Sequence, residues 1–408
     1  MDMKTVTDPA RIDEFLSRGI EMAYPSKDFI RAKMLRGERL SMYLGIDPTG
    51  PTLHLGHAIP LKKMAEFQAL GHQAILLIGD FTATIGDPDK ATARKPLTRK
   101  EVLANAKFYK KQASTFLKFS GANKAQLKYN SKWLSKMRFA DVLNLSSKVT
   151  VEQMLKRDMF QKRMSEGRPL YVHEIMYPLL QGYDSVAMNV DGEIGGNDQT
   201  FNMLMGRDLS KSILNKEKFV ISTKLLVDPS GKKMGKTEGN MVSLDKTAQE
   251  MFGKVLSWTD ELIIPAFELC TNVSSAEIAE IKKTLENGAN PKDQKVRLAK
   301  EIVTLYHGTR AADEAERNFN NTFAKGEVPD GVQEVLVEKG ASLADVLLKA
   351  NVIESKSELR RLIEGKAVSE INEATKGSSV IEDFNFKIEH SISLRIGKKR
   401  FIKIKVKA

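Results

Sequence analysis

The sequence predicts an α/β protein, in which a parallel β-sheet with crossover helices precedes a helical region and a small α+β unit. The apolar run 41–46 stops at an Asp-Pro-Thr-Gly-Pro turn, and a helical pattern follows it to about Leu70. The continuous apolar run 73–78 is typical of a buried parallel strand. Strand, helix and strand in succession form a βαβ unit, whose crossover is right-handed.

The length and composition bound the class of protein. The chain has 408 residues, which is too long for one core and predicts two or three domains. No apolar run is long enough to span a bilayer and no signal-peptide pattern is present, so we expect a cytoplasmic protein. The single cysteine, Cys270, excludes an intramolecular disulfide and fits a reducing compartment.

Two histidines and a glycine begin the first crossover helix, in the stretch His54-Leu-Gly56-His57. A helix start after a buried strand offers free backbone N–H groups and a positive dipole end, which suit a phosphate. Gly56 would let an anion or a flat ring approach the backbone. The alternative is that the histidines only hydrogen-bond the turn. A metal pair is disfavoured, because six histidines and one cysteine form no ligand cluster in the sequence.

Two loops, 47–57 and 79–90, leave the carboxyl ends of the first two parallel strands. Ligands bind at that edge of such sheets, which favours a functional role for the two histidines. Residues 1–40 are predicted to be helical. Residues 97–170 are predicted to be mostly helical, with a short strand at 127–130.

A helix predicted over 171–183 places Tyr177, Gln181 and Asp184 on one face, because they are spaced by four and three residues. A strand is predicted over 185–190, followed by Glu193-Ile-Gly-Gly-Asn-Asp-Gln199 and a helix from Thr200. Two glycines and an acid after a strand suit a nucleotide ribose, although ordinary turns also contain Gly-Gly.

A strand predicted over 219–226 leads into the loop 228–240, which carries three lysines within five residues. A P-loop would need a glycine at position 230, but that residue is Ser230 and the glycine follows at Gly231. No clear helix start follows the Lys-Thr pair either. We therefore favour a loop that holds a polyphosphate during a reaction, with a solvated basic turn as the alternative.

The C-terminal third combines helices with a basic hairpin. A helical region is predicted over 247–321, a linker over 326–331, and helices over 342–349 and 355–365. Residues 341–408 carry 14 Lys and Arg against 9 Asp and Glu, so they hold +5 of the net charge of +12. Lysines alternate with apolar residues in the hairpin predicted over 391–407. This pattern indicates an RNA-binding module.

Together these motifs resemble those of class I aminoacyl-tRNA synthetases. His54-Leu-Gly-His57 and Lys233-Met-Gly-Lys-Thr237 are similar to the two signatures of that class. With Tyr43, the segment 177–184 and the segment 195–199, the chain resembles bacterial tyrosyl-tRNA synthetases over nearly its whole length. Glu193 stands where some members have glutamine.

The resemblance implies an α/β fold with a Rossmann-like parallel-sheet catalytic domain, followed by an α-helical domain and a small α+β S4-like RNA-binding domain. Their expected bounds are 1–240 for the catalytic domain, with a helical connective insertion at about 97–170, 241–328 for the anticodon-binding domain and 341–408 for the S4-like domain.

The resemblance also implies roles for individual residues. The catalytic residues would be His54, His57, Lys233, Lys236 and Thr237. ATP would contact Gly45, Asp47, Gly56, Gly196, Asp198 and Lys236. Tyrosine would contact Tyr43, Thr82, Asp87, Tyr177, Gln181, Asp184 and Gln199. RNA would contact Arg360 and Arg361.

The implied partners are L-tyrosine, ATP with Mg²⁺, tRNA(Tyr) and a second copy of the chain bound through residues 97–170, with no protein-bound metal and no membrane. Tyr43 and Asp184 would bind the substrate phenol, so phenylalanine is expected to be rejected without an editing domain. Tyrosyl-tRNA synthetases are themselves the standard example, with roughly 10⁵-fold discrimination. The alternatives are a P-loop phosphotransferase and a non-catalytic RNA-binding protein.

Overall fold

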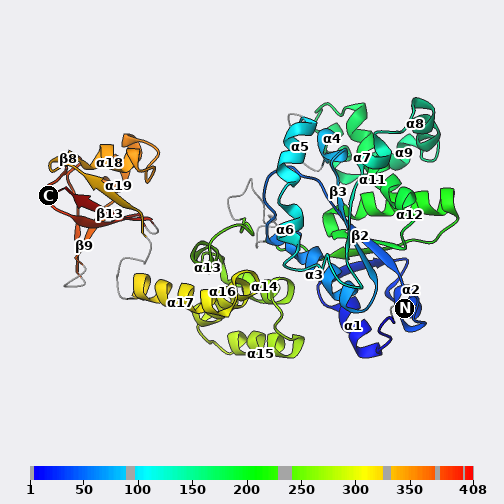
Figure 1. The fold of residues 1–408 in the computed structure, drawn as a ribbon, viewed down its shortest axis with the longest axis horizontal. Coiled ribbons are helices and arrows are strands. Elements are labelled where there is room, and N and C mark those ends of the chain that lie inside the picture. The colour runs from blue at the N-terminus through cyan, green and yellow to red at the C-terminus, as the bar shows by residue number, and fades with distance from the viewer. Residues whose placement is uncertain are drawn as a thin grey trace. The chain divides into compact units, whose positions relative to one another are not determined.

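The computed structural model describes residues 4–88, 97–227, 241–324, 332–372, 377–397 and 400–407. The chain divides into two compact units (Figure 1). The first comprises residues 1–247 and 254–306, and the second comprises residues 248–253 and 307–408.

A six-stranded sheet forms the centre of the described part of the first unit. Its strands are β1 (Ile20–Tyr24), β2 (Ser41–Ile46), β3 (Gln73–Ile78), β4 (Gln126–Tyr129), β5 (Gly192–Gly196) and β6 (Phe219–Thr223). The order is β1-β6-β5-β2-β3-β4, with β1 antiparallel to β6 and the other neighbours parallel. The predicted parallel sheet is confirmed, and so is the first βαβ unit, which runs through α3 (Leu55–Ala69).

Side-chain alternation along β2 separates the two faces of the sheet. Met42, Leu44 and Ile46 belong to a large core that also includes residues of α1 (Pro9–Ser17), α2 (Lys27–Leu35) and α3. Tyr43 points to the opposite face, where it packs with Ile75, Leu77 and Val190. Since successive strand residues point to opposite faces, β2 supports the core with one set of side chains and presents Tyr43 with the other.

The remaining helices of the first unit flank the sheet or follow it in the chain (Figure 1). Those between β3 and β6 are α4 (Thr82–Ile85), α5 (Arg99–Ala106), α6 (Tyr109–Ala113), α7 (Ser131–Leu134), α8 (Phe139–Ser146), α9 (Val151–Leu155), α10 (Asp158–Ser165), α11 (Val172–Met188) and α12 (Thr200–Leu214). Later in the chain come α13 (Ala248–Leu256), α14 (Ile263–Cys270), α15 (Ser275–Glu286) and α16 (Pro291–His307), of which α13 belongs to the second unit over residues 248–253. Two short 3₁₀ helices cover Asn197–Gln199 and Asp260–Leu262.

Two predictions about elements are wrong. The segment 185–190 is not a strand, because α11 continues to Met188 and the next strand begins at Gly192. This apolar run packs against α12, and a buried helix can be as continuously apolar as a buried strand. Residues 1–40 are not wholly helical, because β1 pairs with β6 at the edge of the sheet.

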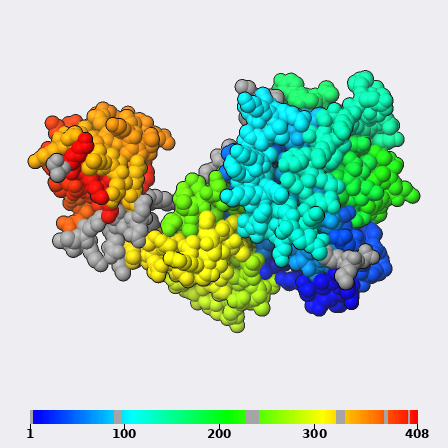
Figure 2. All heavy atoms as spheres, in the orientation of Figure 1, coloured from blue at the N-terminus to red at the C-terminus, as the bar shows by residue number. Residues whose placement is uncertain are grey.

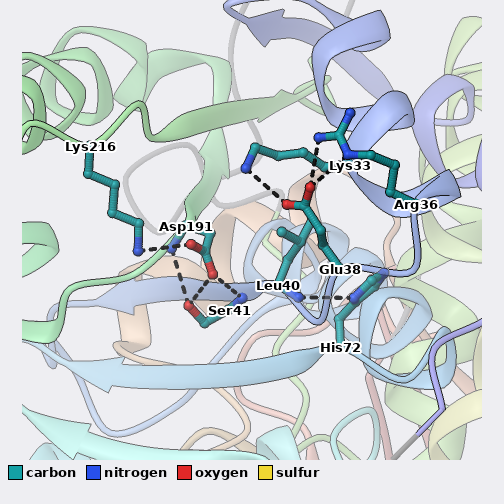
Figure 3. Close-up of polar contacts among 8 residues, drawn as sticks. All are labelled: Lys33, Arg36, Glu38, Leu40, Ser41, His72, Asp191 and Lys216. Atoms are coloured by element: carbon teal, nitrogen blue, oxygen red, sulfur yellow. Dashed lines mark hydrogen bonds and ion pairs between the residues drawn. The ribbon is translucent and has the colours of Figure 1, made fainter.

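Polar contacts fix the amino-terminal ends of the central strands (Figure 3). Asp191 accepts hydrogen bonds of 2.8 Å from both the backbone N–H and the hydroxyl of Ser41, and it pairs with Lys216 at 2.8 Å. Buried His72 accepts a hydrogen bond through Nδ1 from the backbone N–H of Leu40, at 3.3 Å. These contacts set the register of β2 at the end opposite to its loop 47–57.

The second unit contains α17 (Thr309–Ala324) and a small α+β body. Its larger sheet has the order β10-β9-β12-β13-β7, formed by β7 (Glu334–Val337), β9 (Val368–Asn372), β10 (Gly377–Val380), β12 (Ile392–Ile396) and β13 (Arg400–Val406). A two-stranded sheet joins β8 (Ala341–Ser342) and β11 (Lys387–Ile388). Helices α18 (Leu343–Lys349) and α19 (Lys356–Glu364) complete the core.

Both helices and the hairpin predicted for this body are confirmed. The side chain of Ser355 caps α19 by accepting from the N–H of Glu358. Strands β12 and β13 pair antiparallel. Within the described ranges, no helix is long and apolar enough to cross a membrane. The predicted linker 326–331 lies outside these ranges.

Candidate active site

A cavity of about 520 Å³ opens at the carboxyl ends of the parallel strands. The chain runs from β2 to β3 and β4 on one side, then returns to β5 and β6 on the other. The carboxyl ends of the neighbouring strands β2 and β5 therefore mark a topological switch point, where ligands bind in open α/β sheets. The cavity wall contains the predicted site residues Tyr43, Gly45, Asp47, His54, Gly56, His57, Thr82, Asp87, Tyr177, Gln181, Asp184, Gly196, Asp198 and Gln199.

The two histidines cap α3 and also face the cavity. The Nδ1 atom of His54 accepts from the N–H of Gly56 at 3.1 Å, and the Nδ1 atom of His57 accepts from the N–H of His54 at 3.2 Å. Their rings lie 3.9 Å apart. Because each Nδ1 accepts, the neutral rings carry their protons on Nε2 and can donate. Both histidines thus hydrogen-bond the turn, and the same bonds give both rings the tautomer that an anion needs.

Gly56 is required by this arrangement. A Cβ atom at position 56 would lie 2.9 Å from Cε1 of the His54 ring and 3.0 Å from its Nδ1. Any larger residue would therefore push the ring away from the cap. The first turn of α3 keeps its exposed backbone only because this residue has no side chain.

Asp47 links the first loop to two other elements. Its Oδ1 accepts from the hydroxyl of Thr82 at 2.7 Å, and its Oδ2 accepts from the hydroxyl of Tyr177 at 2.8 Å. Burial and then the charge of Asp47 raise the pKa of Tyr177 well above its usual value. Tyr177 therefore remains a neutral donor, and the carboxylate is held between α4 and α11.

Asp184 is a buried acid at the closed side of the cavity, with an exposed fraction of 2%. It accepts from the indole N–H of Trp133 at 2.7 Å and from the amide of Asn130 at 3.3 Å. Burial raises the pKa of Asp184 well above its usual value, while these two donors act in the opposite direction. Asn130 also donates to Thr82 at 3.0 Å, which joins the Asp184 and Asp47 networks.

Tyr43 lies on the central strand and is fully buried. Burial, followed by the charges of Glu193 and Asp184, raises the pKa of Tyr43 well above its usual value. Its hydroxyl forms a 3.1 Å hydrogen bond with Ser185. Tyr43 therefore presents a protonated phenol at the same closed side of the cavity as Asp184.

Asp87 contributes a further carboxylate to the cavity wall. Its carboxylate accepts from the guanidinium of Arg157 at 2.5 Å and from the amide of Gln199 at 2.8 Å. Gln181 donates to Glu193 at 3.2 Å and accepts from Asn202 at 3.0 Å. The side chains that surround the cavity are thus fixed by one another before any ligand enters.

Lys233, Lys236 and Thr237 lie outside the described residues. The residues on each side of that segment are described: those before it line the cavity, and those after it bond to the start of α3. Leu226 contributes to its wall, and the carbonyl of Val242 accepts from the N–H of Leu55 at 3.0 Å. His54 and Ser243 also form an antiparallel bridge.

In the second unit, Arg360 and Arg361 are exposed on α19, while Leu359 and Ile363 are buried on its other side. The guanidinium of Arg360 lies 4.8 Å from the ring centre of Phe384. Two of the hairpin lysines are paired with acids of β7 and its end, Lys405 with Glu334 and Lys407 with Glu338.

The sequence interpretation missed several residues of this network. Asn130 ends the predicted strand 127–130 and Trp133 lies three residues later, so the carboxyl-end rule could have found them. Arg157, Ser185 and Lys218 carry no comparable local signal, because their partners are distant in the sequence. No cluster of three or more metal-ligating side chains occurs among the described residues.

Comparison with known proteins identifies the class. The family model described as class I tRNA synthetases (W and Y) matches residues 35–324, and the chain belongs to this family. Within it, the chain is 44% identical over 406 residues to the tyrosine–tRNA ligase of Carboxydothermus hydrogenoformans, covering 96% of this chain and 97% of that protein. It is 41% identical to tyrosine–tRNA ligase 2 of Vibrio cholerae, covering 96% and 98%.

Solved structures support the same fold. A C-terminally truncated mitochondrial tyrosyl-tRNA synthetase of Coccidioides posadasii aligns with a TM-score of 0.62 at 24% identity, over 76% of this chain and 90% of that one. The tyrosyl-tRNA synthetase of Archaeoglobus fulgidus, crystallised with L-tyrosine, aligns with a TM-score of 0.59 at 20% identity, over 76% and 100%. The first unit therefore has the class I synthetase fold, with a mostly parallel sheet and flanking helices.

Proposed function

We propose that the protein is a tyrosine–tRNA ligase. It activates L-tyrosine with ATP, supplied as the Mg²⁺ complex, and then transfers the tyrosyl group to the 3′-terminal ribose of tRNA(Tyr). The observation that carries the proposal is that Tyr43 and Asp184 are both buried and both contribute to the cavity wall. A phenol with a carboxylate matches a substrate hydroxyl, which can accept one hydrogen bond and donate another.

The amino acid would lie across the switch point. Its phenol would contact Tyr43 and Asp184, and its ammonium would contact Asp87, Tyr177 and Gln181. Thr82 and Gln199 support this assignment indirectly, since Thr82 holds Asp47 and Gln199 holds Asp87. This orientation leaves the substrate carboxylate directed toward the first turn of α3.

The nucleotide would occupy the remainder of the cavity. Gly45, Asp47, Gly196 and Asp198 would hold the nucleoside, while Gly56 and the two histidines would meet the phosphates. Activation forms a bond between a tyrosine carboxylate oxygen and the α-phosphorus, and breaks the bond from that phosphorus to pyrophosphate. The proposed donors His54 Nε2 and His57 Nε2 stabilise negative charge on the phosphate oxygens during this exchange. Positioning supplies the rest, because no protein nucleophile is needed.

Lys233, Lys236 and Thr237 would stabilise the departing pyrophosphate, with Lys236 also contacting ATP. Support comes from the residues before and after their segment, which contribute to the cavity or bond to α3. Three cations or donors at that position would act on charge that grows as pyrophosphate leaves, so they would affect the rate more than ATP binding.

Exposed apolar side chains support a homodimer. Phe139, Leu143, Val151 and Val172 have exposed fractions of 78%, 55%, 67% and 77%. Helices α8 and α11 belong to one hydrophobic cluster, so Phe139 and Val172 extend from neighbouring elements. Residues 97–170 form a broad continuous part of the surface of the first unit (Figure 2). Such exposure typically marks an interface, and we assign it to a second copy of the chain.

The second unit would bind tRNA. We assign residues 341–408 to an S4-like RNA-binding domain, with Arg360 and Arg361 as RNA contacts. Both arginines are exposed on one side of α19, whose other side is buried. Residues 241–328 are assigned to the helical anticodon-binding domain. We assign the enzyme to the cytoplasm.

Charging of a tRNA(Tyr) transcript tests the proposal. Purified protein with ATP should attach labelled tyrosine to the transcript and release AMP. Labelled tryptophan should not be attached under the same conditions. ATP turnover to ADP without any amino acid would instead identify a phosphotransferase. Binding of the transcript without charging would identify an RNA-binding protein.

A further inference from the structure

A buried lysine lies behind the phenol side of the cavity. Lys218 directly precedes β6 and has no exposed surface. Its ammonium donates to Oε2 of Glu193, to the hydroxyl of Ser185 at 2.6 Å and to the carbonyl of Met203 at 3.3 Å. Three acceptors therefore match its three N–H donors. Burying such an ion is strongly unfavourable unless its hydrogen bonds are satisfied, as they are here.

The surrounding backbone leaves room for this contact. A Cβ atom at Gly206 of α12 would lie 2.5 Å from Nζ of Lys218 and 2.7 Å from the hydroxyl oxygen of Ser185. Tyr43 and Glu193 are directly paired across β2 and β5. Lys218 also lies 5.6 Å from the ring centre of Tyr43. Residues of β2, β5, α11 and α12 thus surround the lysine behind the phenol site.

The direction of the hydrogen bonds follows from the lysine. Ser185 accepts from Lys218, because an ammonium group can only donate. If the proton between Lys218 and Glu193 lies on Glu193 instead, the neutral amine accepts that proton in a hydrogen bond. Its own two N–H groups then still donate to Ser185 and to the carbonyl of Met203. The proton of Ser185 must then go elsewhere.

Two acceptors lie near Ser185, and distance separates them. Tyr43 lies at 3.1 Å and the carboxylate of Glu193 at 3.4 Å. Hydrogen bonds between oxygens are usually 2.7–2.8 Å and weaken with length, which favours Tyr43 as the acceptor. Oε2 of Glu193 also accepts from Lys218, so Ser185 would have to share that oxygen with the ammonium group. Once Tyr43 accepts from Ser185, its own proton is available to an acceptor at the cavity, whose wall also includes Glu193.

We propose that Lys218, through Ser185, fixes Tyr43 as a hydrogen-bond donor toward the substrate. The substrate must then carry a para group that accepts from Tyr43 as well as one that satisfies Asp184. A hydroxyl does both. An arylamine fails the first requirement, because its nitrogen lone pair is delocalised into the ring. Lys218 is therefore a positioning residue that selects tyrosine against 4-aminophenylalanine, and this inference rests on the proposed function.

Amino-acid-dependent ATP–pyrophosphate exchange tests the inference, with kcat/KM measured for tyrosine and for 4-aminophenylalanine. The native protein should strongly prefer tyrosine. Lys218→Met leaves Ser185 free to accept from Tyr43, so Tyr43 can accept from an amine. The preference for tyrosine should fall at least about tenfold, as expected for the loss of one hydrogen bond.

Lys216→Met is the matched control. It makes the same change two residues away, where the amine pairs with the partly buried Asp191 (Figure 3) and also donates to the carbonyl of Asn189. The substrate preference of this variant should remain that of the native protein. A preference that falls equally in both variants would overturn the inference.

Two further variants keep the test valid if Lys218→Met does not fold. Lys218→Met/Glu193→Gln removes both buried charges, and Ser185→Ala removes the connecting hydroxyl. Each should lower the preference for tyrosine in the same assay, with folding checked by circular dichroism. An unchanged preference in a folded variant would overturn the role of Lys218. No exchange by the native protein with tyrosine would instead refute the proposed function.

Discussion

The guanidinium of Arg157 lies 2.5 Å from the carboxylate of Asp87, although 70 residues separate them in the sequence. Both side chains are largely buried, with exposed fractions of 6% and 15%. Arg157 stands between α9 and α10, so this contact joins that part of the helical segment to the cavity wall. Asp87 is therefore paired with a cation before the proposed substrate ammonium arrives.

Arg157→Met should lower the free energy of unfolding by about 3–5 kcal/mol, because it leaves a buried carboxylate without its cation. Saturating tyrosine should recover part of this loss, since its ammonium supplies the missing charge. The increase in melting temperature on adding tyrosine should therefore be larger for the variant than for the native protein.

Arg163→Met is the control for that prediction. Arg163 is equally buried and pairs with Glu174 at 2.7 Å, but neither residue contributes to the cavity wall. It should destabilise the protein without enlarging the effect of tyrosine. Equal tyrosine-induced shifts in Arg157→Met and the native protein would contradict the proximity of the ammonium to Asp87.

Asp184→Ala should reduce the preference for tyrosine over phenylalanine by roughly 10–100-fold, the usual contribution of a hydrogen bond to a charged group. The measurement is the ratio of kcat/KM values in pyrophosphate exchange. Asp198→Ala, on the proposed nucleotide side, should slow both amino acids equally and leave the ratio unchanged. An unchanged ratio in Asp184→Ala would remove Asp184 from substrate selection.

His72 should make the stability depend on pH. Burial lowers the pKa of His72 from 6.5 to about 4, so the folded protein keeps it neutral while the unfolded chain takes up a proton below pH 6.5. The stability from this residue is complete above pH 6.5 and is lost as the pH falls toward 4. Between pH 7 and pH 5 the loss should be about 2 kcal/mol.

Urea unfolding at the two pH values measures this effect. His72→Gln keeps an acceptor for the N–H of Leu40 (Figure 3) and should remove most of the pH-dependent loss. His173→Gln, at an exposed position of α11, should retain it. The same loss in His72→Gln as in the native protein would show that other groups are responsible.

Phe139→Asp/Val172→Asp should convert the proposed dimer into a monomer, because the two most exposed of these apolar side chains would become charged. Sedimentation equilibrium gives the mass directly. Met22→Asp changes an exposed apolar residue on β1, with an exposed fraction of 46%, and should leave the mass unchanged. A native protein that sediments as a monomer would contradict the dimer.

The sequence predicts the cavity well because its wall is built from local loops after parallel strands. His54, Gly56 and His57 begin a helix, as predicted, and a helix start after a buried strand suits an anion. Tyr177, Gln181 and Asp184 share the cavity as predicted from their spacing on one helix. The wrong strand at 185–190 arose because apolar composition cannot distinguish a buried helix from a buried strand.

The supporting residues were not predictable in the same way. Arg157 reaches Asp87, and Lys218 reaches Glu193 and Ser185, across 70, 25 and 33 residues. Each is an ordinary basic residue in the sequence, and only the fold makes it a buried partner. The chemistry at the cavity surface is local in sequence, whereas the contacts that position it are long-range.

Tyrosine-dependent ATP–pyrophosphate exchange tests the central claim most directly. Purified protein should exchange pyrophosphate into ATP when tyrosine is present, with tryptophan and phenylalanine giving rates lower by several orders of magnitude. That result is expected if Tyr43 and Asp184 bind the substrate phenol. Exchange supported by tryptophan or phenylalanine as well as by tyrosine would contradict the account.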